Sequence, residues 1–426
     1  MGKSTARDAV LRTVEDARDE IVALTQAMIR IPTINPPGDA YEPCARLIGD
    51  VLSRHHFGVE YFTAVERPEH SGRFPRVNVV GRREGKGKGP TLHFNGHFDV
   101  VPVGDGWTCD PFGGEVRDDR IYGRGASDMK AGIAAAIYAA EAIRRAGIAL
   151  DGSLEISGTV DEESGGWAGV AHLASIGRLS AKNTDYVIIP EPFGANRICI
   201  GHRGVYWFEI TTHGRIAHGS MPFLGDNAIE HMGEVLHELN SSMKPLLSQR
   251  RLSMPVVPAE ARHATLNVNA ISGGQSGHDV QSPCVADRCS VVLDRRFLPE
   301  EALATVRDEI VQVIERVKAR IPELRYEVRD MMVVEPVQLP KGSPLVAAIE
   351  NAMSHAGLGA PEIVASPGTY DHKHVTRIGG IQQCVAYGPG QLELAHQPDE
   401  WCGIDDLVRA TQVMALTALD LLSPDA

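Results

Sequence analysis

The sequence predicts an α/β fold in which a mainly parallel sheet, flanked by helices, is interrupted by an inserted α+β domain. First, apolar strand-like runs alternate with helical segments over the first 200 residues, as they do in parallel sheets. Second, the segments that follow have the order β-α-β-β-α-β, with strands that are polar on one face. We therefore expect a larger domain at 1–202 and 335–426, with the inserted domain at 203–334.

The first part of the larger domain begins with two predicted helices. Apolar residues recur at helical spacing over residues 8–32 until "IPTINPPGD" ends the pattern, and a second helix is predicted near 42–55. Four apolar runs predict strands, at 77–82, 91–99, 153–160 and 185–190. An alanine-rich stretch from Asp128 to about Gly147 predicts a long helix between the second and third strands.

The inserted domain is predicted from alternating polar and apolar residues. "GVYWFEITTHG", "ATLNVNAISGG", "CSVVLDRRF" and "LRYEVRDMMV" predict strands with one solvent face. "DNAIEHMGEVLHELNSSM" and residues 300–320 predict its helices. Beyond about residue 338, a helix at 343–356, a strand near 381–387 and a helix at 403–422 complete the larger domain.

Composition limits the classes of partner. The chain has 426 residues and a formal net charge of −13, which argues against nucleic acid or an anionic membrane surface as a partner. No run of 18 apolar residues occurs, so no membrane span is expected. The seven cysteines are scattered, without a CxxC pair, which is typical of reduced thiols in the cytoplasm. We expect a small-molecule substrate.

Several polar residues follow predicted strands or precede a helix, and such positions carry ligands in parallel sheets. They are His97, Asp99, Asp128, Glu162, Glu163, Glu191 and His396. Because a metal-binding imidazole usually donates its other N–H to a carboxylate, Asp99 is predicted to orient His97. A solvated pair at a strand end is the alternative. The adjacent acids of "TVDEESGG" suit metal-assisted hydrolysis, in which one acid binds the metal and the other transfers protons.

Two of these residues have ordinary explanations when taken alone. Asp128 in "YGRGASDMKAG" precedes the alanine-rich helix, where an aspartate most often caps the helix. His396 in "ELAHQPDEW" is by itself typical of a surface histidine. Glu191 in "VIIPEPFG" follows an apolar strand between two prolines, which hold its backbone rigidly.

The order HxD, SDMK, DEE, EP and AHQPDE resembles the di-metal family of aminoacylases, carboxypeptidase G, acetylornithine deacetylase and succinyl-diaminopimelate desuccinylase. The resemblance extends from about Ile21 to His396, and "HFNGHFDVVPVGDGWTCDPFGGEVRDDRIYGRGASDMKAG" is its most specific stretch. It implies two divalent metal ions, for which carboxylate and imidazole ligands suit Zn, Co or Mn. The implied ligands are His97 and Glu191 for one ion, Glu163 and His396 for the other, and Asp128 for both.

The same resemblance implies the chemistry. Glu162 would act as general base and acid towards a water activated by the two ions. Asp99, which is predicted to orient the metal ligand His97, is also counted among the catalytic residues. A cis peptide bond is implied between Asp128 and Met129. The implied reaction is hydrolysis of the amide in an N-acyl amino acid or a related small molecule.

The inserted segment resembles the lid and dimerisation domain of the family. The resemblance implies a homodimer through this domain. His218 in "GRIAHGSMPFLGDNAIEH" would stabilise the oxyanion, often across the dimer. Arg296 in "LDRRFLPEE" and Asn267 in "NVNAISGG" would lie near the substrate, whereas Arg295 would point to the opposite face.

Two stretches depart from the family pattern. "HDVQSP" places Asp279 where relatives often carry an amide, and "SPGTYDHKH" replaces the commoner Gly-Gly-Thr-Asp loop. We expect Thr369 and Tyr370 of this second stretch to contact substrate, with His372 and His374 nearby. Three alternatives stay open. The departures favour the first, hydrolytic deamination of an aryl amine such as a nitro-substituted anthranilate; the others are a cytosolic dipeptidase and a non-catalytic binding protein. The intact Glu162 and Glu163 pair argues against the last of these.

Overall fold

The computed structural model describes residues 3–274, 283–340 and 342–423. Asp279, predicted to alter the substrate pocket, lies outside these residues. The chain divides into two compact units. The first comprises Met1–Gly201, Leu339–Val364 and Tyr370–Ala426, and the second His202–Gln338 and Ala365–Thr369. Each unit is described by itself below.

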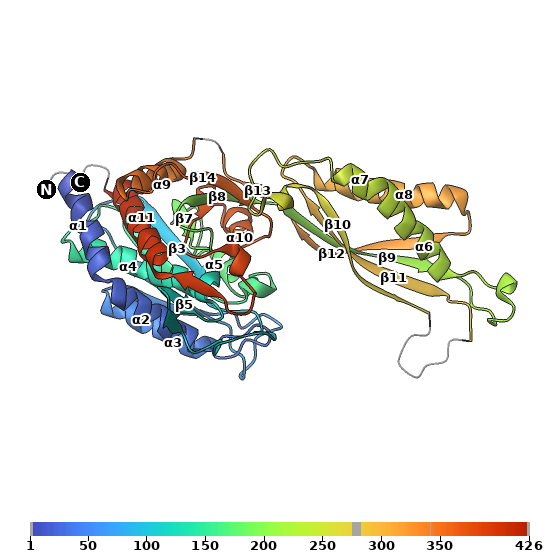
Figure 1. The fold of residues 1–426 in the computed structure, drawn as a ribbon, viewed down its shortest axis with the longest axis horizontal. Coiled ribbons are helices and arrows are strands. Elements are labelled where there is room, and N and C mark those ends of the chain that lie inside the picture. The colour runs from blue at the N-terminus through green and yellow to red at the C-terminus, as the bar shows by residue number, and fades with distance from the viewer. Residues whose placement is uncertain (1–2, 275–282, 341, 424–426) are drawn as a thin grey trace. The chain divides into compact units, whose positions relative to one another are not determined.

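A mixed sheet forms the centre of the first unit, in the order β1-β2-β6-β3-β7-β15-β8, and β14 pairs with β8 (Figure 1). Its strands are β1 (Gly58–Thr63), β2 (Val77–Arg83), β3 (Thr91–His97), β6 (Ser153–Thr159), β7 (Tyr186–Ile189), β8 (Arg197–His202), β14 (Glu362–Ser366) and β15 (Cys384–Ala386). The central pairs β6-β3, β3-β7 and β7-β15 are parallel. The pairs on either side, β1-β2, β2-β6 and β15-β8, are antiparallel. The α/β class is therefore confirmed, with the parallel strands at the centre.

Helices surround this sheet (Figure 1). They are α1 (Lys3–Asp16), α2 (Arg18–Ile29), α3 (Tyr41–Arg54), α4 (Ala131–Arg145), α5 (Val170–Ser175), α9 (Pro344–His355), α10 (His372–Arg377) and α11 (Ile404–Leu422). Every residue of α4 from Ala131 to Ile143 is buried, because its small side chains allow close packing against α11 and β3. The helix predicted at 8–32 is two helices, since the backbone at Ala17, with φ −90° and ψ 3°, is not helical.

A small sheet that was not predicted joins distant parts of the chain. It consists of β16 (Trp401–Gly403), β5 (Arg120–Tyr122) and β4 (Glu115–Arg117), in that order. Three-residue strands are too short to show a period of two in the sequence. Pairing of β16 with β5 brings the segment around residue 400 beside the residues that lead into α4.

The second unit has the predicted β-α-β-β-α-β order (Figure 1). Its sheet is antiparallel, in the order β10-β11-β9-β12. Its elements are β9 (Gly204–His213), α6 (Ala228–Glu238), α7 (Lys244–Leu247), β10 (Thr265–Gly273), β11 (Arg288–Phe297), α8 (Leu303–Arg320), β12 (Arg325–Val334) and the short β13 (Val337–Gln338). The Asn227 side chain caps α6 by accepting a bond of 3.0 Å from the Ile229 N–H. None of the helices in the described ranges has the length and apolar character required of a membrane span.

Candidate active site and metal centre

Strand β3 ends at His97, which is buried. Its Nδ1 lies 3.1 Å from the main-chain oxygen of Asp99 and 3.5 Å from the Asp99 carboxylate. These contacts fix the ring so that Nε2 faces Asp128, at 3.1 Å from Oδ1. Burial lowers the pKa of His97, but the hydrogen bonds with Asp128 and Asp99 raise it by more. The resulting pKa lies well above the usual value. Asp99 thus lies where the sequence predicted an orienting group, although its nearer contact is through the main chain.

Asp128 faces a different histidine with each carboxylate oxygen. Oδ1 approaches His97, and Oδ2 lies 3.4 Å from His396 Nε2. Asp128 lies in the segment Ala126–Lys130, directly before α4, where its own backbone is not helical, with φ −115° and ψ 95°. No side chain caps the first turn of α4. The ordinary explanation of Asp128 as a helix cap therefore does not apply. The peptide bond between Asp128 and Met129 is cis, as the family resemblance implied.

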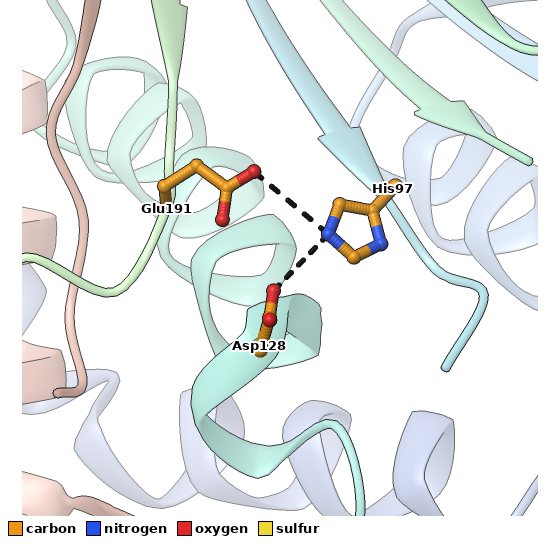
Figure 2. A group of neighbouring side chains, drawn as sticks. All are labelled: His97, Asp128 and Glu191. Atoms are coloured by element: carbon orange, nitrogen blue, oxygen red, sulfur yellow. Dashed lines mark hydrogen bonds and ion pairs between the residues drawn. The ribbon is translucent and has the colours of Figure 1, made fainter. Parts of the chain in front are cut away.

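The described residues contain two groups of side chains whose donor atoms lie within 4.8 Å of one another. The first is His97, Asp128 and Glu191, and Figure 2 shows one nitrogen of the His97 ring facing both carboxylates. His97 Nε2 is 3.8 Å from Glu191 Oε1. The second is Asp128, Glu163 and His396, in which His396 Nε2 is 3.0 Å from Glu163 Oε2. Asp128 is common to both, as in the arrangement that the resemblance implies.

The donor atoms of both groups suit divalent cations. They are carboxylate oxygens and imidazole nitrogens without a thiolate, a set that fits Zn, Co or Mn. Burial and the negative charge of Asp128 raise the pKa of Glu163 to about 7. The same two causes raise the pKa of Glu191 well above its usual value. Acids gathered at this density repel one another, and a cation among them would remove that repulsion.

Comparison with known proteins is decisive for the family. The family model described as peptidase family M20/M25/M40 matches residues 93–420. The chain belongs to this family. It is therefore a metal-dependent hydrolase of the M20 family.

Individual relatives agree with this assignment. A succinyl-diaminopimelate desuccinylase of Rhodospirillum centenum is 28% identical over 398 residues, which cover 92% of this chain and 95% of the relative. The crystal structure of human carnosine dipeptidase 1 has a TM-score of 0.74 at 18% identity and covers 98% of both chains. A dinuclear metal binding peptidase of the M20 family from Bacillus subtilis has a TM-score of 0.71 at 17% identity and covers 96% of this chain and 99% of that one. At these identities the two structures show a shared fold.

In this M20 enzyme, the two adjacent glutamates lie in a short turn after β6. The carboxylate of Asp99 accepts hydrogen bonds of 3.2 Å from the main-chain N–H groups of both Glu162 and Glu163. Asn35 donates a third bond, of 2.8 Å, to the same carboxylate. Asp99 therefore positions the glutamate pair as well as facing His97, a second role that the sequence did not reveal.

Asp161 turns the chain into the glutamate pair. Its φ of 60° lies in the left-handed region, which non-glycine residues adopt rarely and aspartate more readily than most. The Tyr41 hydroxyl and Arg76 Nε hold its carboxylate at 2.7 and 2.9 Å. These contacts stabilise the turn. The motif "TVDEES" did not indicate that Asp161 has a different role from the two glutamates that follow it.

Glu400 is a further buried acid at the site, and it was not predicted. One of its oxygens accepts hydrogen bonds from the N–H groups of Ser127 and Asp128, at 2.8 and 3.0 Å. The other accepts from Arg124 Nη1 at 2.7 Å and from the N–H of Gly125 at 3.2 Å. Glu400 thus fixes the main chain that carries Asp128.

His396 also has a left-handed backbone, with φ of 64°, and its Nε2 lies 3.0 Å from Glu163 and 3.4 Å from Asp128. Hydrogen bonds with Asp128 and Glu163 raise the pKa of His396 to about 10, although burial opposes the change. The His396 side chain is 49% exposed, so it is a surface histidine as the sequence suggested, but its Nε2 faces the carboxylates of Asp128 and Glu163.

The predicted substrate-binding residues are divided between the units. Tyr370 belongs to the first unit and is buried, with its hydroxyl 3.5 Å from Cys199 Sγ and 3.3 Å from His372 Nδ1. The other predicted contacts belong to the second unit; they are His218, Asn267, Arg296 and Thr369. Their roles towards substrate remain predictions.

Local contacts orient two of the residues in the second unit. His218 Nδ1 accepts from the main-chain N–H of Ser220 at 3.1 Å. Arg296 Nε donates to Asp294 at 2.9 Å, while the neighbouring Arg295 is buried.

Proposed function

We propose that this M20 enzyme hydrolyses the amide bond of an N-acyl amino acid or a related small amide at a centre of two divalent metal ions. The observation that carries the proposal is the position of Asp128, whose two carboxylate oxygens face two histidines of separate groups. The ions would be held by His97, Asp128, Glu163, Glu191 and His396. The desuccinylase relative, which spans nearly the whole chain, supports an N-acyl substrate.

The protein side chains supply proton transfer and orientation. When bound, the two ions supply Lewis-acid chemistry, polarising the scissile carbonyl and acidifying water at the site. Glu162 accepts a proton from the attacking water as the C–O bond forms, and gives it to the nitrogen as the C–N bond breaks. The Asp99 carboxylate keeps Glu162 in place by accepting a hydrogen bond from the main-chain N–H of Glu162. His218 would donate a hydrogen bond to the oxygen that becomes negative.

The experiment begins with enzyme whose metal has been removed by a chelator and verified as absent. We expect turnover to disappear and to return with Zn, Co or Mn, because the proposed reaction depends on the ions to polarise the carbonyl and to acidify water. N-acyl amino acids, dipeptides and aryl amines are then screened for release of the carboxylate, of free amino acids and of ammonia. Full turnover without metal would refute the proposal, and ammonia release from aryl amines alone would favour the deaminase alternative.

We further propose that residues 203–334 form a lid and dimerisation domain, and that 1–202 and 335–426 form the catalytic domain. Large apolar side chains exposed on the second unit support a homodimer through that domain; they include Ile216, Phe223 and Ile271. All seven cysteines are free, which supports a cytoplasmic location.

Mixing two inactive variants tests the dimer and the role of His218 together. We expect His218→Ala to lower kcat by about 10²- to 10³-fold without loss of metal, as expected for an oxyanion donor. If His218 acts across the dimer, a heterodimer with Glu162→Gln has one site with both defects and one with neither. Recovered activity near half per heterodimer supports a shared site. No recovery, with subunit exchange confirmed, contradicts it.

A further inference from the structure

The segment from Asp371 to His374, here called the supporting segment, packs against the turn that carries the catalytic glutamates. His374 Nε2 lies 2.7 Å from the main-chain oxygen of Gly165, and its ring centre is 4.8 Å from that of Trp167. Asp371 approaches Gly166 so closely that a β-carbon there would lie 2.7 Å from Asp371 Oδ1. The part of "SPGTYDHKH" that departs from the family loop is therefore in direct contact with the turn.

Lys373 is the residue of this segment that reaches Glu162 itself. Its Nζ lies 3.5 Å from Glu162 Oε1. The two side chains are 8% and 11% exposed, so little water screens the attraction between them. A glutamate has three side-chain torsions, and an opposite charge on one side of its carboxylate restricts the orientations available to it.

We infer that Lys373 is a positioning residue that holds the Glu162 carboxylate in the orientation needed for proton transfer. The inference deepens the proposed function, because it rests on Glu162 as the general base. The surroundings support it: Asn95 Nδ2 donates to Asp371 Oδ2 at 2.9 Å, which fixes the supporting segment beside the turn. Lys373 acts through Glu162, and this distinguishes it from a residue that binds substrate.

The test replaces Lys373 by methionine, which keeps an unbranched side chain one atom shorter than lysine and removes its charge. We expect Lys373→Met to lower kcat by about 10- to 100-fold, since small displacements of a reacting group have effects of this size. KM and metal content should change less than about twofold, because the variant leaves the metal ligands intact. A matched control is Lys86→Met. Lys86 also pairs with an acid, Asp151 at 3.6 Å, but the Lys86 side chain is 63% exposed.

Unchanged kcat in folded Lys373→Met would overturn the inference, and so would a loss confined to KM or to metal content. Lys373→Arg, which keeps the cation, should restore most of kcat. If the methionine variant does not fold, Lys373→Gln takes its place and should show the same loss, and near-normal kcat in that variant would also refute the role.

A double variant separates this inference from the function on which it rests. In a Glu162→Gln background, Lys373→Met should lower the residual kcat by less than about twofold, because residues that act as one unit are not additive. A full additional loss in that background would show that Lys373 acts independently of Glu162. If Glu162→Gln alone retains normal turnover, the proposed base is wrong. If that variant is inactive while Lys373→Met is normal, the inference about Lys373 alone fails.

Discussion

Replacing Glu162 by glutamine should lower kcat by about 10²- to 10⁴-fold, the usual contribution of a general acid–base, while the protein stays folded. Glutamine keeps the size of the side chain but cannot accept the proton of the attacking water. Metal content should not change, because Glu162 belongs to neither group of donor atoms. The main-chain bond from residue 162 to Asp99 does not depend on the side chain, so the turn should survive. Steady-state kinetics, metal analysis and thermal unfolding measure the three effects.

The neighbouring residue provides the control. Glu163→Gln makes the same chemical change one position along, on a side chain whose carboxylate lies 3.0 Å from His396 Nε2. We expect this variant to lose metal from the group formed by Asp128, Glu163 and His396, with activity partly recovered at high metal concentration. Near-normal turnover of Glu162→Gln would assign proton transfer to another group. Loss of metal in Glu162→Gln would make that residue a ligand.

The parts of the site that could be predicted are those where polar residues interrupt a strong local pattern. His97 ends a strand of seven buried residues, and Glu191 follows the apolar β7. A single sequence shows such interruptions, because ionisable side chains at the end of a buried strand are costly unless a metal ion, another polar group or water satisfies them. The spatial grouping required the family motifs, since Asp128 and His396 are separated along the chain and each has an ordinary local explanation.

The role of Glu400, and the contacts of Asp99 with the glutamate turn, could not be predicted, because these carboxylates act on the main chain across long sequence separations. Glu400 accepts from the N–H of Asp128, 272 residues earlier in the sequence. In the stretch "HQPDEW" alone, Glu400 cannot be distinguished from a solvated acid. Its position becomes clear only in the fold, where the short strand β16 pairs with β5. The sequence predicted β2 as a strand, at 77–82, but not that it runs antiparallel to its neighbours. Strand direction depends on the path of the chain between strands, and periodicity carries no information about it.

Replacing Asp128 by alanine should remove both metal ions, because both groups of donor atoms include this carboxylate. The expected loss of kcat is at least about 10³-fold, since Lewis-acid stabilisation is worth several kcal/mol. The fold should persist, because Glu400 binds the main-chain N–H of residue 128, which alanine retains. The substitution also removes the negative charge that raises the pKa values of Glu163 and Glu191. It also removes the hydrogen bonds by which Asp128 raises the pKa values of His97 and His396, so the two effects on the stability of the metal-free protein oppose each other.

Two single substitutions show whether Asp128 is the shared ligand. His97→Ala leaves the group of Asp128, Glu163 and His396 complete, and His396→Ala leaves the group of His97, Asp128 and Glu191 complete. If each histidine serves one ion, each variant should retain about half of the metal of the parent enzyme, whereas Asp128→Ala should retain almost none. Metal analysis after equilibration at one fixed concentration of free cation distinguishes these results. Equal metal loss in all three variants would mean that the two groups bind as one cooperative unit. Half occupancy in Asp128→Ala would mean that Asp128 binds only one ion. In that case the group that does not depend on Asp128 keeps its ion when the carboxylate is removed.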